Sequence, residues 1–155
     1  FQILHQVGEK NYDTFKKKLD SEIKEITLKR KYEAVPYLHE NLGAAYQAAD
    51  IVISRASSGV IFEIASFGKP SLLIPLPESA NDHQRKNAYE FAKSGAAVVI
   101  EERNLVPGIV ISQIRNILHN EEVLERTKAA ALKIFKPGAA EEIAEEIVKV
   151  IEESR

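Results

Sequence analysis

Residues 49–88, ADIVISRASSGVIFEIASFGKPSLLIPLPESANDHQRKNA, carry the strongest fold signal in the chain. Their apolar, β-branched runs 51–54 and 71–76 have the length of buried parallel strands, and one helix fits between them. We therefore predict a βαβ unit. In such a unit the loops that follow the strands form the binding crevice, and here these loops are 55–59 and 77–83.

The flanking sequence continues the alternation of strands and helices. Further strands are predicted at 2–7, 33–38 and 96–100. Further helices are predicted at 12–24 with Asn11 or Asp13 as cap, after Asn41 as cap, and at 82–93, 107–119, 121–135 and 139–153. This pattern is typical of an α/β fold, with one Rossmann-like doubly wound parallel sheet in a single domain. The first strand and Gly-rich phosphate loop of such a sheet are lacking before residue 2.

The composition fits one packed domain and argues against several classes of function. The chain has 155 residues, of which 45% are apolar and 28% charged, and its formal net charge is −2. This charge favours neither nucleic acid nor an acidic membrane surface as a partner. Without cysteine there is no disulfide or thiolate chemistry, and four scattered histidines form no zinc pattern. The lack of cysteine fits a reducing, cytoplasmic compartment. No apolar run reaches the roughly 20 residues that span a bilayer.

The polar turn after the first strand of the βαβ unit is a predicted anion site. Ser57, Ser58 and Gly59 lie where the chain passes from strand to helix, so backbone N–H groups and the positive end of the helix dipole converge there. A phosphate or pyrophosphate suits this place, and Arg55 could add a charge-assisted contact. Two alternatives stay open: a serine that only caps the helix, and an Arg55 that pairs with a surface carboxylate.

Glu63 is a candidate ligand for a ribose. It lies in an otherwise apolar helix, one turn from the anion site, where a carboxylate is costly unless it has partners. Its two oxygens are suited to accept hydrogen bonds from the two vicinal ribose hydroxyls. The alternative is a solvated glutamate that is favoured near the helix start by the helix dipole.

A second group of candidates begins the helix at 82–93. His83 and Asn87 are four residues apart and share a helix face, and Gln84 lies beside them. Neutral groups that both donate and accept hydrogen bonds are suited to recognise sugar hydroxyls. The alternative is the ordinary polar start of a surface helix.

Several runs of the sequence closely resemble one enzyme family. These runs are SRASSGVIFEIASFGKPSLLIP, NDHQRKNA, LHQVG, PYLHEN, AAYQAAD and KPGAAEEIA, and they cover nearly the whole chain. Together they resemble the carboxyl-terminal half of the MurG family of N-acetylglucosaminyltransferases of peptidoglycan synthesis. The resemblance implies the donor-binding half of a two-domain GT-B enzyme. Such an enzyme transfers N-acetylglucosamine from UDP-N-acetylglucosamine to a lipid-linked muramoyl-pentapeptide, with no required metal or other cofactor.

The resemblance also implies roles for single residues. Glu63 matches the glutamate that binds the uridine ribose, and the loop around His39 matches the backbone that contacts uracil. The helix start that faces the donor diphosphate is matched by Ser58, Gly59 and Val60. The amides around the sugar are matched by Gln84 and Asn87, with His83 beside them.

The sequence departs from the family pattern R-x-G-A-x-T, because it reads RASSGV at 55–60. The glycine has moved and the threonine hydroxyl is gone, which puts the detail of the phosphate contacts in question. Backbone N–H groups can still bind the phosphates.

The resemblance implies that part of the enzyme lies outside this chain. The acceptor domain and the catalytic base are not in these 155 residues, so no catalytic residue is assigned and the chain alone is not expected to catalyse transfer. The intact enzyme is expected to be peripheral on the inner face of the plasma membrane. Alternatives are a related UDP-sugar transferase with another lipid acceptor, and a truncated α/β module without activity. The apolar stripe of helix 139–153 makes a homodimer a further expectation.

Overall fold

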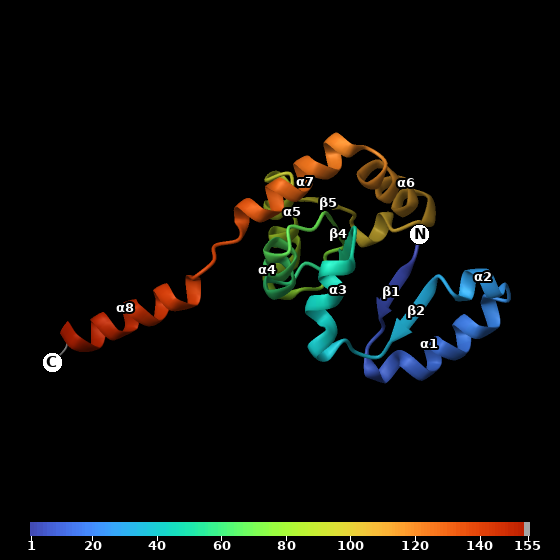
Figure 1. Ribbon diagram of the computed structural model, residues 1–155, viewed down its shortest axis with the longest axis horizontal. Coiled ribbons are helices and arrows are strands. Elements are labelled where there is room, and N and C mark those ends of the chain that lie inside the picture. Colours follow the sequence, from blue (N-terminus) through green and yellow to red (C-terminus); the bar gives the residue numbers. More distant parts are fainter. Residues whose placement is uncertain (154–155) are drawn as a thin grey trace. The chain divides into compact units, whose positions relative to one another are not determined.

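The computed structural model describes residues 1–153 and divides into two compact units, shown in Figure 1. The first unit is Phe1–Ala48 and the second begins at Ala49. The first contains β1 (Ile3–Gln6), α1 (Glu9–Glu22), α2 (Ile26–Lys29), β2 (Tyr32–Val35), the 3₁₀ helix η1 (His39–Asn41) and α3 (Leu42–Ala48).

The second unit contains three strands, five α-helices and two 3₁₀ helices within its described residues. In chain order these are β3 (Val52–Ser54), α4 (Ser58–Ser66), β4 (Ser71–Leu73), η2 (Ala80–Asp82), α5 (His83–Lys93), β5 (Ala97–Val99), η3 (Glu102–Asn104), α6 (Pro107–Leu118), α7 (Glu121–Ile134) and α8 (Ala139–Glu153).

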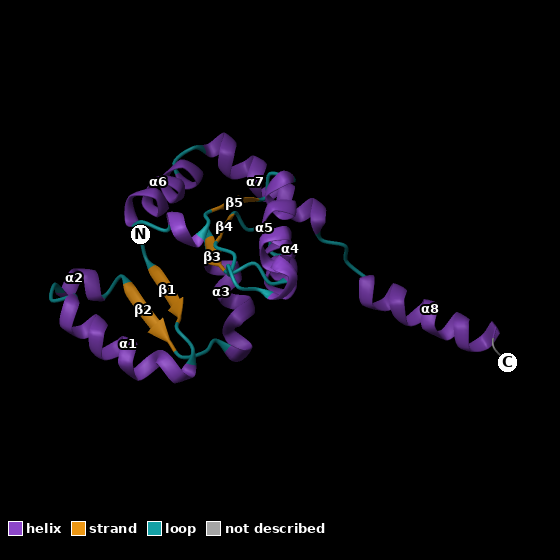
Figure 2. Cartoon of the chain, turned by 180° about the vertical axis from the view of Figure 1, so that it is seen from behind, coloured by secondary structure: helices purple, strands orange, loops and turns teal. Residues whose placement is uncertain are grey.

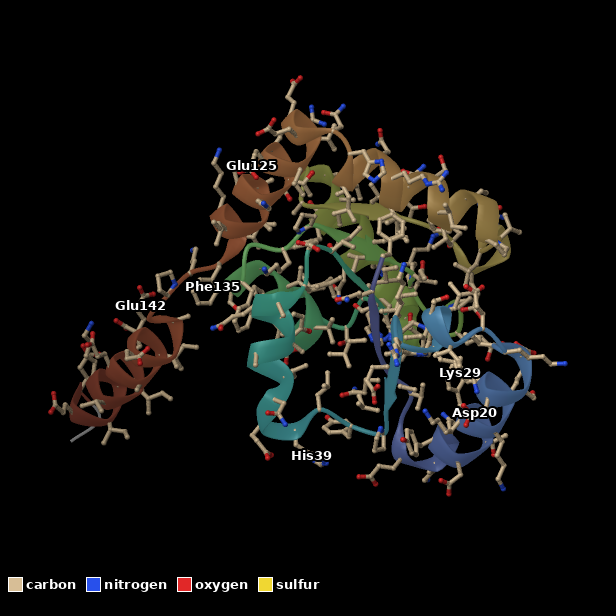
Figure 3. The ribbon with its side chains drawn as sticks, turned by 45° about the vertical axis from the view of Figure 1, so that its right-hand side comes forward. Asp20, Lys29, His39, Glu125, Phe135 and Glu142 are labelled. Carbon is tan, nitrogen blue, oxygen red and sulfur yellow. The ribbon has the colours of Figure 1, made fainter. Side chains whose placement is uncertain are left out.

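The strands of the first unit form a parallel pair. β1 pairs with β2 in a register that sets Ile3 opposite Tyr32 and Gln6 opposite Val35. Figure 1 shows the two strands side by side, with α1 and α2 as the connection between them. Lys29 on α2 lies 3.3 Å from the Asp20 carboxylate on α1, and both are labelled in Figure 3. Such an exposed ion pair contributes little to stability.

Local predictions in the first unit are corrected in two places. The caps Asn11 and Asp13 are wrong, because α1 begins one turn earlier at Glu9. Gly8, with φ 84°, turns the chain from β1 into this helix, a backbone conformation that glycine adopts without strain. Asn41 is also not a cap, because it lies inside η1, which runs directly into α3.

Three rings pack together between β1, β2 and α1. His5 lies edge-on to Phe15 with ring centroids 5.1 Å apart, and its Nδ1 is 2.5 Å from the hydroxyl of Tyr32. Phe15 stacks on Tyr32 at 6.2 Å. Burial lowers the pKa of His5 and raises the pKa of Tyr32, because the charged form of each side chain loses hydration.

The lowered pKa of His5 predicts that the first unit loses stability in mild acid. Because the folded state holds His5 neutral, the unfolded chain binds more protons as the pH falls below about 6.5, the ordinary histidine pKa. The contribution of neutral His5 to the free energy of unfolding is complete above this pH and decreases steadily below it. We expect the urea midpoint to fall between pH 7.5 and pH 5.5. Tyrosine fluorescence would report it, since the chain has no tryptophan.

The control for this prediction is His5→Asn, which keeps a polar side chain but does not titrate. This variant is expected to have a lower midpoint at both pH values and a smaller change between them. An equal change in wild type and variant would show that other groups cause the pH dependence.

The second unit is built on a parallel sheet of strand order β3–β4–β5, drawn in orange in Figure 2. The register sets Ser54 opposite Leu73 and Leu73 opposite Val99. β4 is central, and all three of its residues are 0% exposed. This agrees with the continuous apolar run at this position, which is typical of a strand covered on both faces.

Helices complete the core of the second unit. α4 follows β3, α5 packs against β5, and α7 packs against α4 and α6. Gly68 permits the close approach of α7 at the end of α4, because a Cβ there would lie 2.7 Å from Leu132 Cγ. The most deeply buried large side chains are Ile64, Leu72, Leu73 and Ile117. The apolar side chains of α8 are exposed.

The α/β class with parallel strands is confirmed, but the strands form two ladders instead of one sheet. Within residues 1–153, β1 pairs only with β2, and β3 only with β4. The strands at 51–54 and 71–76 are shorter than predicted, and the strand at 33–38 ends at Val35. Prolines at positions 36 and 75 stand just beyond the observed ends, where they have no N–H to give to a ladder.

Candidate functional site

The carboxyl ends of β3 and β4 bring most of the candidate residues to one edge of the sheet. The loop after β3 carries Arg55 and leads into α4, and the loop after β4 leads through η2 into α5. Because parallel strands end at the same edge, residues that are far apart in the sequence can meet there.

The start of α4 has the geometry of an anion site. Ser57 is the N-cap residue, with φ −69° and ψ 152°, and it makes no side-chain capping bond. Its carbonyl accepts the N–H of Ile61, so the N–H groups of Ser58, Gly59 and Val60 precede the first intrahelical donor. Ser58 and Gly59 are exposed, and nothing lies within 4 Å of a Cβ placed on Gly59. A ligand can therefore approach the backbone closely.

Glu63 lies on the same face of α4 as Gly59 and Val60. It follows Gly59 by four residues and Val60 by three, the spacings at which helical residues are neighbours. The rise along the axis from Gly59 is about 6 Å. Glu63 is half-buried, and its backbone carbonyl accepts the hydroxyl of Ser66. This spacing suits a ligand with an anionic part at the helix end and hydroxyl groups one turn further along.

Two side chains of α5 hold the loop that leads into α4. Oε1 of Gln84 accepts the N–H of Ala56 at 3.3 Å and the N–H of Leu76 at 3.1 Å. Nδ2 of Asn87 donates to the carbonyl of Ala56 at 3.3 Å. The predicted sugar ligands Gln84 and Asn87 thus lie beside the anion site, and part of their hydrogen-bonding capacity is used by the protein itself.

His83 begins α5 and is exposed. Its Nδ1 lies 2.7 Å from the carbonyl oxygen of Ala80, so Nδ1 carries the proton and Nε2 is an acceptor. Before it, Asn81 and Asp82 have left-handed backbone conformations, with φ 51° and 58°. These two residues make the tight turn that brings His83 to the start of the helix.

Arg55 pairs with a carboxylate, which is one of the alternatives that the sequence left open. Its Nη1 is 2.6 Å from Oε2 of Glu102, and it also donates to the carbonyls of Ile74 and Pro75 at 3.2 and 3.4 Å. One nitrogen thus ties together the segments that follow all three strands. A contact of Arg55 with a donor diphosphate stays a prediction.

Two acidic residues after β5, Glu101 and Glu102, were not among the site residues predicted from the sequence. Besides Glu102, Glu101 binds Arg85 at 3.0 Å and accepts the hydroxyl of Tyr89 at 2.8 Å. The hydrogen bond to Glu101 is the main cause that raises the pKa of Tyr89, and the Glu101 charge is the main cause that raises the pKa of Arg85. Their position directly after a strand, at the edge where ligands bind, was the available signal.

His39 belongs to the first unit, where Figure 3 labels it beside α3. It has φ 44°, its ring centroid is 4.7 Å from that of Tyr37, and its Nε2 is 4.0 Å from a Glu9 oxygen. The neighbouring N–H of Leu38 donates to Gln6 Oε1 at 3.0 Å. The role of this loop in uracil binding stays a prediction.

The part of the chain that the structure describes contains no group of three or more His, Asp or Glu side chains that could hold a metal ion. Among its helices none combines the length and the apolar character needed to cross a bilayer.

Comparison with known proteins identifies the relatives of the chain. The family model described as "Glycosyltransferase family 28 C-terminal domain" matches residues 1–146. Two relatives are named UDP-N-acetylglucosamine–N-acetylmuramyl-(pentapeptide) pyrophosphoryl-undecaprenol N-acetylglucosamine transferase. The protein from Chlorobaculum parvum is 42% identical over 113 residues, 73% of this chain and 31% of the relative. The protein from Moorella thermoacetica is 33% identical over 150 residues, 97% of this chain and 40% of the relative.

Solved structures show the same relationship. The crystal structure of Acinetobacter baumannii MurG matches with a TM-score of 0.77 and 27% identity, over 96% of this chain and 43% of that one. The glycosyltransferase VinC, solved in complex with dTDP, matches with a TM-score of 0.61 and 28% identity, over 79% of this chain and 30% of that one. The chain thus spans less than half the length of these relatives. From the family match and the identities, this chain belongs to glycosyltransferase family 28, in the part described as its C-terminal domain.

Proposed function

We propose that this chain is the donor-binding half of a hexosyltransferase that uses UDP-N-acetylglucosamine. The observation that carries the proposal is the start of α4, where the N–H groups of Ser58, Gly59 and Val60 precede the first intrahelical donor and Glu63 follows Gly59 by one turn. The N–H groups of Ser58, Gly59 and Val60 bind the diphosphate, and Glu63 accepts the ribose hydroxyls. Membership of glycosyltransferase family 28 supports this reading.

The remaining donor contacts are assigned to atoms that the protein does not already use. Nε2 of Gln84, Oδ1 of Asn87 and Nε2 of His83 are proposed to face the sugar. The loop at His39 is proposed to contact the base through its backbone. Arg55 is proposed to donate further N–H groups to the diphosphate, since its bonds to the sheet edge and to Glu102 are all made by Nη1.

For the intact enzyme we propose an inverting transfer of N-acetylglucosamine to a lipid-linked muramoyl-pentapeptide, the reaction in the names of the relatives. A base in the acceptor domain takes the proton of the acceptor hydroxyl, and the α4 N-terminus stabilises the departing UDP. We propose that no metal or other cofactor takes part. The intact enzyme would work at the inner face of the plasma membrane, and this chain by itself would bind donor without turnover.

Calorimetric titration of the purified chain tests the proposal. Saturable binding of UDP and UDP-N-acetylglucosamine is expected. UDP-glucose is expected to bind more weakly than UDP-N-acetylglucosamine, because it lacks the N-acetyl group and the contacts that this group would make. Titrations with EDTA and with Mg²⁺ are expected to agree. Failure of a folded chain to bind any uridine diphosphate would reject the proposed function and leave a module without donor binding.

A second candidate is a family relative that uses another nucleotide sugar or another lipid acceptor. The structural similarity to the glycosyltransferase VinC, which was solved in complex with dTDP, supports this candidate. Tighter binding of dTDP than of UDP in the same titration would support this candidate. A homodimer formed through the exposed apolar side of α8 also remains a proposal.

A further inference from the structure

The loop that leads into α4 depends on one side-chain oxygen of α5. Oε1 of Gln84 accepts the N–H groups of Ala56 and Leu76, which follow the neighbouring strands β3 and β4. An amide oxygen has two lone pairs, so both are occupied. The remaining capacity of this side chain, the Nε2 donors, is free to face a ligand. A single side chain thus links both loops that border the candidate site.

Ala56 is held from both sides. Its N–H is bonded to Gln84 and its carbonyl to Asn87, and its side chain is fully buried. Ala56 stands two residues before Ser58, the first residue of α4. The orientation of the peptide groups around Ala56 therefore sets the direction in which the first N–H groups of α4 point.

Gln84 is bonded to the loop after β4 through its backbone as well as through its side chain. The backbone N–H of Gln84 donates to the hydroxyl of Ser79 at 3.2 Å, and Ser79 belongs to the same loop as Leu76. Gln84 is thereby seated at the start of α5 by the loop that its side chain holds. A site ordered before the ligand arrives loses less free energy in ordering on binding.

We propose that Gln84 is a positioning residue, whose Oε1 holds the loops after β3 and β4 so that the α4 N-terminus is preorganised for the donor diphosphate. This inference rests on the proposed function. It assigns to Gln84 a role that differs from sugar recognition, because it acts through Ala56 and Leu76 and affects UDP itself, which has no sugar to transfer.

Two variants separate the acceptor oxygen from the rest of the side chain. Gln84→Met keeps the length and removes both polar groups, while Gln84→Glu keeps acceptor oxygens and removes the Nε2 donors. Because Gln84→Glu also changes the charge by −1, Lys93→Gln serves as the matched control. Lys93 is exposed at the end of the same helix, and its Nζ bonds to Glu90, outside both linked loops.

The measurements are UDP affinity by calorimetry and amide hydrogen exchange by NMR. In Gln84→Met we expect UDP to bind about tenfold to thirtyfold more weakly, from the loss of two hydrogen bonds. We expect the amides of Ala56 and Leu76 to exchange at least about tenfold faster. The amide of Ile74, which bonds to Ser54 at 2.8 Å, should keep its rate. In Gln84→Glu both amides stay slow, as in Lys93→Gln, because its carboxylate oxygens still accept the two N–H groups.

The inference is overturned if Gln84→Met binds UDP as wild type does, or if the amides of Ala56 and Leu76 exchange as fast in Gln84→Glu as in Gln84→Met. It is also overturned if exchange at Ile74 accelerates together with Ala56 and Leu76, since that result describes general loosening. A wild-type chain that binds no UDP rejects the proposed function itself. The two failures are therefore distinguishable.

Discussion

Replacing Leu73 with alanine is expected to remove about 2–5 kcal/mol from the free energy of unfolding of the second unit. Leu73 is 0% exposed and stands on the central strand β4, opposite Ser54 on one side and Val99 on the other. The lost side chain leaves a cavity that neighbouring strands cannot close without breaking their register. Since domains are stable by only about 5–15 kcal/mol, this is a large fraction of the total.

Urea unfolding followed by circular dichroism at 222 nm measures the effect. The urea midpoint should fall. The slope of the free energy of unfolding against urea concentration should stay the same, because unfolding still exposes the same amount of surface. Ile111→Ala is the control, since Ile111 is 44% exposed on α6 and should cost less than about 1 kcal/mol. Equal losses in the two variants would show that β4 is not the centre of the core.

Replacing Glu63 with alanine is expected to weaken UDP binding about tenfold to a hundredfold. Hydrogen bonds to a charged group contribute about 1.5–3 kcal/mol, and the variant loses those to the ribose. The fold should be retained, because alanine is a favourable helix residue and Glu63 is only half-buried. Glu90→Ala is the control for the charge, since Glu90 is an exposed residue of α5 that pairs with Lys93.

The ligand supplies a second test of the Glu63 assignment. 2′-Deoxy-UDP lacks one of the two vicinal hydroxyls, so wild type should bind it more weakly than UDP. In Glu63→Ala the two ligands should bind alike, because the group that distinguishes them is gone. A preference for UDP that persists in the variant would place the ribose contact on another residue.

Local predictions succeeded where the signal is short-range. The run at 71–76 has the continuous apolar character of a strand covered on both faces, and β4 at its centre is fully buried. The positions of α4 and α5 follow from the strand before each and the polar turn between. The caps at Asn11, Asp13 and Asn41 failed because Gly8 and a 3₁₀ turn began the helices earlier, and alternatives one turn apart differ little in local free energy.

The side-chain partners of the site could not be predicted in the same way. Arg55 was expected near an anion, and the structure adds Glu102, 47 residues further along the chain. Gln84 was expected to face a sugar, and the structure shows its oxygen on Ala56, 28 residues away. Nothing in the spacing of these residues reveals such pairs, because they depend on how neighbouring strands end at a common edge.

The amino-acid sequence alone determined the α/β class and the parallel strands, which follow from hydrophobic periodicity over a few positions. Its motifs also resemble the family that the comparisons show, and the turn at Ser57-Ser58-Gly59 stays a predicted anion site. Only the tertiary structure decided that the strands form two ladders and that Arg55 ties the strand ends to Glu102. It also decided that Gln84 and Asn87 hold Ala56. These features depend on contacts between segments that are distant in the sequence, which exist only once each unit has packed.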